Sequence, residues 1–120
     1  MPSTPEIRSL DPDDLDALGD LKLQAFGGPR QEMALDRLTV PPERTVAAYD
    51  GSRLVGTVSV YDYRQWFGGR AVPCGGVAGV TIAADQRGRG LARTLLGEAT
   101  ARMRGERQAV SSLFPPVAWL

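Results

Sequence analysis

The sequence contains no histidine and a single cysteine, Cys74. Without histidine the chain lacks the commonest general base and the commonest metal ligand of proteins, so we expect no metal site. One cysteine allows no internal disulfide, which favours a cytoplasmic protein. The 14 lysines and arginines balance the 14 aspartates and glutamates, and this net charge of zero argues against a general nucleic-acid binder.

Long apolar runs are absent as well. No segment approaches the ~20 apolar residues that a membrane-spanning helix needs, and Glu6, Arg8 and Asp11 follow no apolar stretch at the N-terminus. We therefore expect neither a membrane segment nor a signal peptide. A chain of 120 residues is long enough for one domain with a modest core, so residues 1–120 are predicted to form a single domain.

The stretch from Val80 to Leu96 is the most informative part of the sequence. It reads VTIAADQRGRGLARTLL, an apolar β-branched run followed by a polar turn with Gly88 and Gly90 and then by apolar residues three or four apart. This pattern predicts a strand, a glycine turn and a helix N-terminus in close succession. A helix start leaves backbone N–H groups unpaired and partially positive, and glycines let an anion approach them.

The charges around this turn indicate what it binds. A free helix N-terminus prefers acidic residues, yet Arg87, Arg89 and Arg93 crowd this one and Asp85 is the only nearby acid. Three cations at a positive helix end repel it unless an anion sits there. We therefore predict a phosphate or pyrophosphate site. A plain strand-to-helix turn with solvated arginines is the alternative that these residues leave open.

Hydrophobic periodicity and turn residues predict the remaining elements. Asp11-Pro12 is typical of a helix start, with Asp11 as the cap, and Asp50-Gly51-Ser52-Arg53 is typical of a hairpin turn. Strands are expected over 6–10, 45–49, 54–61, 71–83 and 108–114, helices over 12–26, 30–38 and 91–104, and a polar and aromatic link over 63–70.

The order of these elements is β-α-α-β-β-β-α-β. An antiparallel hairpin comes first, and the helix between the last two strands forms a crossover that makes those strands parallel. We therefore expect an α/β fold with a mixed, mostly antiparallel sheet flanked by helices. Three glycines in the fourth strand, Gly75, Gly76 and Gly79, suggest a bulge or a close backbone approach there.

The run Arg87-Gly88-Arg89-Gly90-Leu91-Ala92 matches the R-x-x-G-x-G/A motif, between a strand and a helix, of the GNAT superfamily of acetyl-CoA-dependent N-acetyltransferases. The wider run VPCGGVAGVTIAADQRGRGLAR and the later SSLFP resemble the Eis (enhanced intracellular survival) branch. The resemblance covers essentially the whole chain. It implies a GNAT-like fold in which strands four and five splay apart, with coenzyme A in the gap. It also implies an N-terminal domain, truncated after the fifth strand, of a longer protein that forms homo-oligomers.

The resemblance assigns the cofactor contacts by position. Strand backbone would pair with the pantetheine arm, the amides of the turn would cradle the pyrophosphate, and the arginines would add charge. The cofactor-binding residues implied in this way are Val80, Thr81, Ile82, Arg87, Gly88, Arg89, Gly90, Leu91, Ala92 and Arg93.

The chemistry that the resemblance implies is direct attack of a neutral primary amine, such as an aminoglycoside or a lysine, on the thioester. A backbone N–H near Val80 to Ile82 would stabilise the oxyanion. In Eis-like proteins a tyrosine after the fifth strand protonates the leaving thiolate, and the far C-terminal carboxylate serves as base. Both positions would lie beyond Leu120, so no catalytic residue is assigned.

Other reactive side chains favour structural roles. Cys74 lacks a base partner, and we expect it in the core. Tyr49, Tyr61 and Tyr63 could act as acids but are expected to pack with wet hydroxyls. Trp66, Phe67 and Trp119 could line an acceptor pocket or pack under a loop, and Asp11, Asp13 and Asp14 suit helix capping. Asp62 and Asp85, near strand ends, could hold an amine.

Two other functions remain to be weighed against acetyl transfer. The chain could bind coenzyme A as a scaffold without activity. It could also be a different nucleotide binder, but the Rossmann pattern requires Gly or Ala where Arg93 stands, and the P-loop requires a lysine that does not follow these glycines.

Overall fold

The computed structural model describes residues 3–26 and 40–113. The predicted helix over 30–38 and Trp119 lie outside these residues. The described elements are β1 (Glu6–Ser9), η1 (Pro12–Asp14), α1 (Leu15–Phe26), η2 (Pro42–Arg44), β2 (Thr45–Asp50), β3 (Arg53–Phe67), β4 (Arg70–Ile82), η3 (Ala84–Gln86), α3 (Leu91–Gly105) and β5 (Val110–Leu113).

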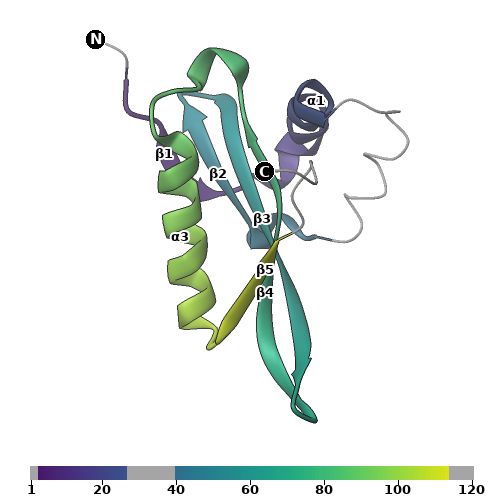
Figure 1. The fold of residues 1–120 in the computed structure, drawn as a ribbon. Coiled ribbons are helices and arrows are strands. Elements are labelled where there is room, and N and C mark those ends of the chain that lie inside the picture. The colour runs from purple at the N-terminus through teal and green to yellow at the C-terminus, as the bar shows by residue number, and fades with distance from the viewer. Residues whose placement is uncertain (1–2, 27–39, 114–120) are drawn as a thin grey trace.

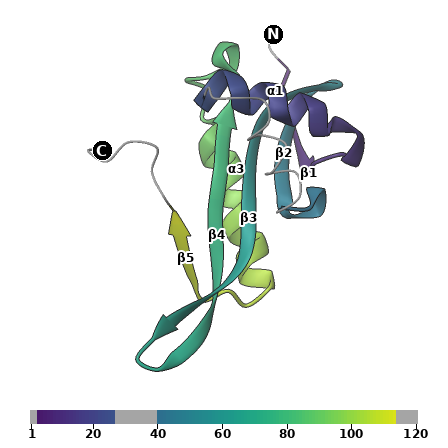
Figure 2. The same ribbon diagram turned by 90° about the vertical axis from the view of Figure 1, so that its right-hand side faces the viewer.

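The five strands form one sheet in the order β1-β2-β3-β4-β5. The first three pairs are antiparallel, whereas β4 and β5 are parallel and are joined by the α3 crossover. Helix α3 covers one face of the sheet and α1 the other (Figure 1; turned by 90° in Figure 2). The predicted fold class, a mixed and mostly antiparallel sheet with a parallel last pair, is therefore confirmed.

Strand β5 pairs with only a part of β4. The pairing runs from Cys74 opposite Val110 to Val77 opposite Leu113, which is the last residue of β5, and Figure 2 shows β5 as a short strand beside the much longer β4. Strand β4 continues to Ile82. The segment of β4 that leads to the glycine turn thus keeps β3 as its neighbour but has no partner from the described part of β5.

The core lies between α3 and the sheet. Helix α3 buries Leu91, Leu95, Ala99 and Met103, spaced four residues apart on one face. Leu95 is fully buried, as are Val46 and Val58 of the sheet. On the opposite face the start of the first helix matches its prediction, because Asp11 accepts a hydrogen bond from the Asp13 amide at 2.9 Å.

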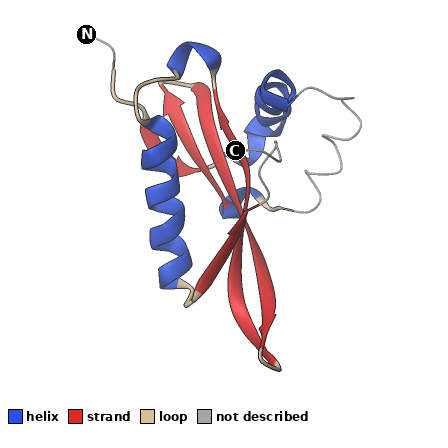
Figure 3. Cartoon of the chain, viewed as in Figure 1, coloured by secondary structure: helices blue, strands red, loops and turns tan. Residues whose placement is uncertain are grey.

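The prediction of a link over 63–70 is wrong. Strand β3 continues to Phe67, turns through Gly68 and Gly69, both at positive φ, and returns as β4 at Arg70. The two strands form an arm that projects from the sheet, seen at the bottom of Figure 3. A two-stranded ribbon buries neither of its faces, so its sequence shows no alternation of apolar and polar residues. In the arm, Trp66 is 69% exposed and Phe67 is 55% exposed.

The glycines of β4 serve two purposes. Gly79, at φ +59°, forms the predicted bulge, where the register with β3 shifts. Gly75 and Gly76 allow close approach, because a Cβ at Gly75 would stand 2.0 Å from Met103 Sδ and one at Gly76 would stand 2.7 Å from the Tyr63 ring.

Among the described residues, no helix has the length and apolar character required to cross a membrane.

Two neighbouring leucines of α3 allow a test of how this helix packs against the sheet. Leu95 is 0% exposed and Leu96 is 37% exposed, so Leu95→Ala should lower the free energy of unfolding by about 2–5 kcal/mol. Leu96→Ala, the same change one residue along the same helix, should cost less than about 1 kcal/mol. Urea unfolding followed by circular dichroism measures both. Equal losses would contradict the assignment of the buried face.

Candidate functional site

The glycine turn between β4 and α3 is open to solvent. Gly88 and Gly90 have φ values of +78° and +75°, and Gly90 is the residue that precedes the helix. A Cβ added at either glycine would meet no atom within 4 Å. The positive φ is a conformation that glycine adopts at no steric cost. The turn therefore exposes bare backbone at the beginning of α3.

The N-terminus of α3 carries no built-in anion. Within the described residues, no side chain caps the helix at Gly90, and its first turn contains no acidic residue. The first amides of a helix have no partner inside the helix and carry partial positive charge. No atom stands within 4 Å of where a Cβ would be at Gly88 or Gly90, so the backbone of the turn that leads into the helix is accessible to an external anion.

The three arginines at the turn, Arg87, Arg89 and Arg93, are exposed but differ in their contacts. Arg89 donates to Gln86 Oε1 and to the Ser3 carbonyl, the latter at 3.1 Å, which ties the N-terminal segment to the turn. Arg87 Nε donates to the Ile82 carbonyl at 3.4 Å. In the part of the chain that the structure describes, Arg93 has no hydrogen-bonded partner. Arg87 and Arg93 are thus the more available charges.

Asp85, the acid nearest these arginines, is engaged elsewhere. Both of its oxygens accept hydrogen bonds from Arg53, at 2.7 and 2.8 Å. These bonds with the Arg53 guanidinium hold the pKa of the Asp85 carboxyl below its usual value. Because this carboxylate pairs with Arg53, Asp85 neither serves as a counter-ion for the arginines of the turn nor is available to hold an amine.

A cluster of hydroxyl groups lies beneath the bulge of β4. Thr57 Oγ1 is 2.6 Å from Thr81 Oγ1 and donates to the Gly79 carbonyl at 3.2 Å. All of these groups lie on the α1 face, where a Cβ at Gly79 would stand 3.1 Å from Lys22 Cε. This cluster was not predicted from the sequence. The feature that could have indicated it is the pair of hydroxyl residues Thr57 and Ser59, which lie two apart in the otherwise apolar run 54–60.

The other reactive side chains have structural roles. Cys74 is buried, with Sγ 3.7 Å from Ser112 Oγ, as predicted for a core residue. Tyr49 packs in the core as predicted, but its hydroxyl is not wet: it donates to Asp14 Oδ2 at 2.8 Å, and burial raises its pKa. Tyr61 and Tyr63 stack on each other at 5.1 Å. Trp66 and Phe67 occupy the exposed end of the arm instead of lining a pocket beside the turn.

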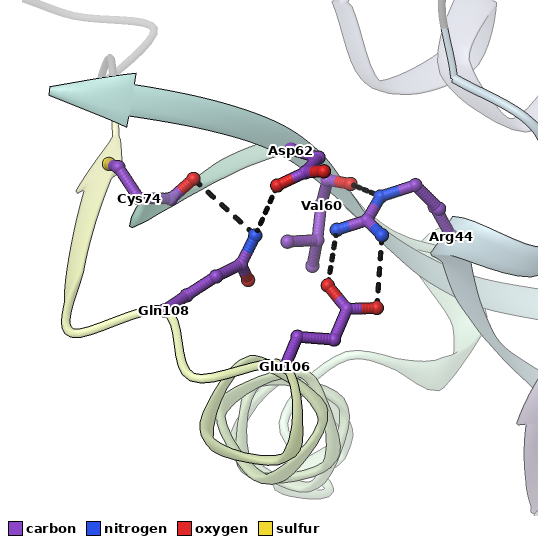
Figure 4. A network of polar contacts seen from close by, with 6 residues as sticks. All are labelled: Arg44, Val60, Asp62, Cys74, Glu106 and Gln108. Atoms are coloured by element: carbon purple, nitrogen blue, oxygen red, sulfur yellow. Dashed lines mark hydrogen bonds and ion pairs between the residues drawn. The ribbon is translucent and has the colours of Figure 1, made fainter. Parts of the chain in front are cut away.

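A polar network joins the base of the arm to the far end of α3 (Figure 4). Arg44 makes two hydrogen bonds of 3.0 Å to Glu106 and one of 2.8 Å to the Val60 carbonyl. The Gln108 amide donates to Asp62 at 3.1 Å and to the Cys74 carbonyl at 3.5 Å. Because Gln108 lies two residues before β5, the network fixes where β5 begins, and it engages the Asp62 carboxylate. It lies at the opposite end of α3 from the glycine turn.

A groove of about 760 Å³ runs between α3 and β5, lined among others by Leu96, Met103 and Leu113. None of the turn residues lines it. The groove is mainly apolar and presents side chains, whereas the turn presents backbone amides and arginines. The groove is therefore separate from the turn at which the sequence predicts an anion site.

Comparison with known proteins identifies the family. The family profile described as an acetyltransferase (GNAT) domain matches residues 6–118. An uncharacterized N-acetyltransferase of Streptomyces avermitilis is 31% identical over 121 residues, which span 98% of this chain and 28% of that relative. A GCN5-related N-acetyltransferase structure from Kribbella flavida is 26% identical with a TM-score of 0.82, covering 96% of this chain and 31% of that one.

A structure of Eis1 from Mycobacterium abscessus shares the fold at 19% identity, with a TM-score of 0.80, and covers 97% of this chain and 29% of the other. The chain thus spans less than a third of the length of these relatives. The strand order of the sheet and its parallel last pair agree with the family that the profile identifies. The chain belongs to the GNAT acetyltransferase family, whose members take the acetyl group from acetyl-CoA.

Proposed function

We propose that this chain is an N-acetyltransferase domain that transfers the acetyl group of acetyl-CoA to a primary amine, on an aminoglycoside or a lysine-like acceptor. The observation that carries the proposal is the uncapped N-terminus of α3, which lies behind two open glycines and has arginines beside it. The proposal includes membership of the Eis-like branch, assembly as a homo-oligomer in the full-length protein and a cytoplasmic location. The basis of the first two is the motif resemblance, and the basis of the third is the single cysteine, Cys74.

In this proposal the turn binds the diphosphate of coenzyme A. The backbone N–H groups from Gly88 to Ala92 donate to phosphate oxygens, as donors at helix N-termini do for anions. Arg87, Arg89 and Arg93 add positive charge. Hydrogen bonds to charged groups contribute about 1.5–3 kcal/mol each, so the loss of one such contact should weaken binding by roughly 10- to 150-fold.

The pantetheine arm then extends along β4. Backbone groups of Val80, Thr81 and Ile82 have no described β5 partner, so an extended ligand can pair there as an added strand would. Moving along β4 away from the turn brings the thioester to the bulge at Gly79. Val80 is partly buried, which limits the access of water to that point.

Acetyl transfer at this position is a direct displacement. The lone pair of the neutral amine forms the C–N bond, the thioester carbonyl becomes an oxyanion, and the C–S bond then breaks to release the thiolate of coenzyme A. The amine loses its proton and the thiolate gains one. A backbone N–H of β4 supplies the oxyanion donor, a contribution that is typically 10²–10³ in rate. The general acid and base are left unassigned.

Substitution at Gly90 tests the diphosphate site. Gly90→Glu should lower the affinity for coenzyme A by on the order of 100-fold, because it blocks the approach and adds like charge. Gly51→Glu is the matched control, since Gly51 also has positive φ (+61°) and open space around it but lies in the β2–β3 turn. Isothermal titration calorimetry measures both. Unchanged binding by the Gly90 variant would remove this residue from the site.

Removing the diphosphate from the ligand is the complementary test. Pantetheine, which lacks all phosphates, should bind at least ~10-fold more weakly than coenzyme A, because it forfeits the charge-assisted bonds at the turn. Arg93→Gln should narrow this difference, whereas Arg70→Gln, a change of the same type on the arm, should leave it unaltered. Equal affinity for the two ligands would contradict the assignment of the turn.

Turnover separates the proposed enzyme from a coenzyme A-binding scaffold. Incubation with acetyl-CoA and a panel of primary amines should release free thiol at a rate that depends on the amine, as followed by a thiol reagent. An aminoglycoside and a lysine peptide with a free side-chain amine represent the two acceptor classes. Tight binding of coenzyme A without amine-dependent release of thiol for any of the amines tested would favour the scaffold.

A further inference from the structure

The bulge in β4 has a defined register. Thr57 of β3 lies opposite Thr81, and Ser59 lies opposite Ala78, so Gly79 and Val80 together face the single residue between Thr57 and Ser59. Gly79 adopts φ +59°, as the first residue of this type of bulge commonly does. The bulge therefore turns the peptide group between Gly79 and Val80 out of the regular ladder.

Two buried hydroxyls hold that peptide group. Thr57 and Thr81 are 0% and 2% exposed, and their oxygens are 2.6 Å apart. The Gly79 carbonyl lies 3.2 Å from Thr57 Oγ1 but 3.5 Å from Thr81 Oγ1. Each hydroxyl has one proton, and either threonine can be the donor in the pair. The shorter distance to the carbonyl favours the arrangement in which Thr81 donates to Thr57 and Thr57 donates to the Gly79 carbonyl.

Fixing the carbonyl also fixes the neighbouring amide. In a trans peptide the C=O and the N–H point in opposite directions, and the described chain contains no cis peptide bond. Since Thr57 belongs to β3, the opposed Val80 N–H is directed away from that strand. On the edge of β4 that lies opposite β3, pairing with the described part of β5 ends at Val77. This edge is where the proposed function places the thioester.

The surroundings leave the peptide group little freedom. A Cβ at Gly79 would stand 3.1 Å from Lys22 Cε and 3.7 Å from Ser59 Oγ, so α1 and β3 both pack against the bulge. Lys22 is buried as well. A second hydroxyl pair, Thr45 and Ser59 at 3.0 Å, lies on the same face without contacting the Gly79 carbonyl in any described hydrogen bond.

We propose that Thr57, supported by Thr81, is a positioning residue that aims the Val80 N–H at the thioester carbonyl of acetyl-CoA. This inference rests on the proposed function and adds to it the side chains that prepare the oxyanion donor. Neither hydroxyl contacts the reacting atoms. Their effect is to hold the donor in place before the carbonyl oxygen acquires its negative charge, so that no reorganisation is needed during reaction.

Infrared spectroscopy tests the inference without requiring turnover. The 120-residue chain is loaded with acetyl-CoA carrying a ¹³C label in the thioester carbonyl, whose stretching frequency falls when the oxygen accepts a hydrogen bond. Thr57→Val should raise this frequency relative to the wild-type complex, and Thr57→Ser should restore it. Thr81→Val should give a smaller rise. Coenzyme A affinity, measured by calorimetry, should change less than threefold in each variant.

Thr45→Val is the matched control, because it removes an equally buried hydroxyl from the neighbouring pair and should leave the carbonyl band unmoved. Where amine-dependent turnover is measured, Thr57→Val should lower kcat on the order of 10-fold with little change in KM for acetyl-CoA. An unshifted band in Thr57→Val, or an equal shift in Thr45→Val, would overturn the inference while the proposed function stands. Failure of the wild-type chain to bind coenzyme A would overturn both.

Discussion

The unpaired amides at the beginning of α3 constrain this part of the structure more than any other feature. A helix of 15 residues has a positive end that most proteins neutralise with a capping side chain or an acid. Here Gly90 supplies no cap, and Asp85 pairs with Arg53 instead. In the proposed function a bound anion neutralises this positive end of the helix, and the open glycines allow the anion to approach.

In the proposed function the sheet below the turn serves the same ligand. The polar network around Gln108 and Arg44 fixes the start of β5 at one end of the molecule, while the pairing of β4 with the described part of β5 stops at Val77. Between that point and the turn, the edge of β4 has no partner among the described residues. In our proposal buried hydroxyls orient the backbone of the bulge at the start of this edge. Cofactor binding and acetyl transfer would then depend mainly on backbone groups, which the fold positions through side chains that lie outside the site.

The sequence predicted the elements whose signals are local. The helix from Leu91, the cap at Asp11, the hairpin turn at Gly51 and the bulge at Gly79 each follow from one or two residues with restricted conformations. The arm was missed because a ribbon exposed on both faces has no periodic apolar pattern. The Thr57 cluster was missed because its members come from β3 and β4, and only the register brings them together. Ion pairs such as Arg53 with Asp85 could not be predicted either, because other charged residues of the chain could have served as the partner.

The central claim is that the amides preceding and opening α3 hold the diphosphate of coenzyme A. A ¹H–¹⁵N NMR titration of the chain observes each of those amides directly. The account predicts that coenzyme A causes its largest shifts at residues 88–92 and that pantetheine leaves these signals in place. Binding of coenzyme A with its largest shifts elsewhere, for example along the groove between α3 and β5, would contradict the account.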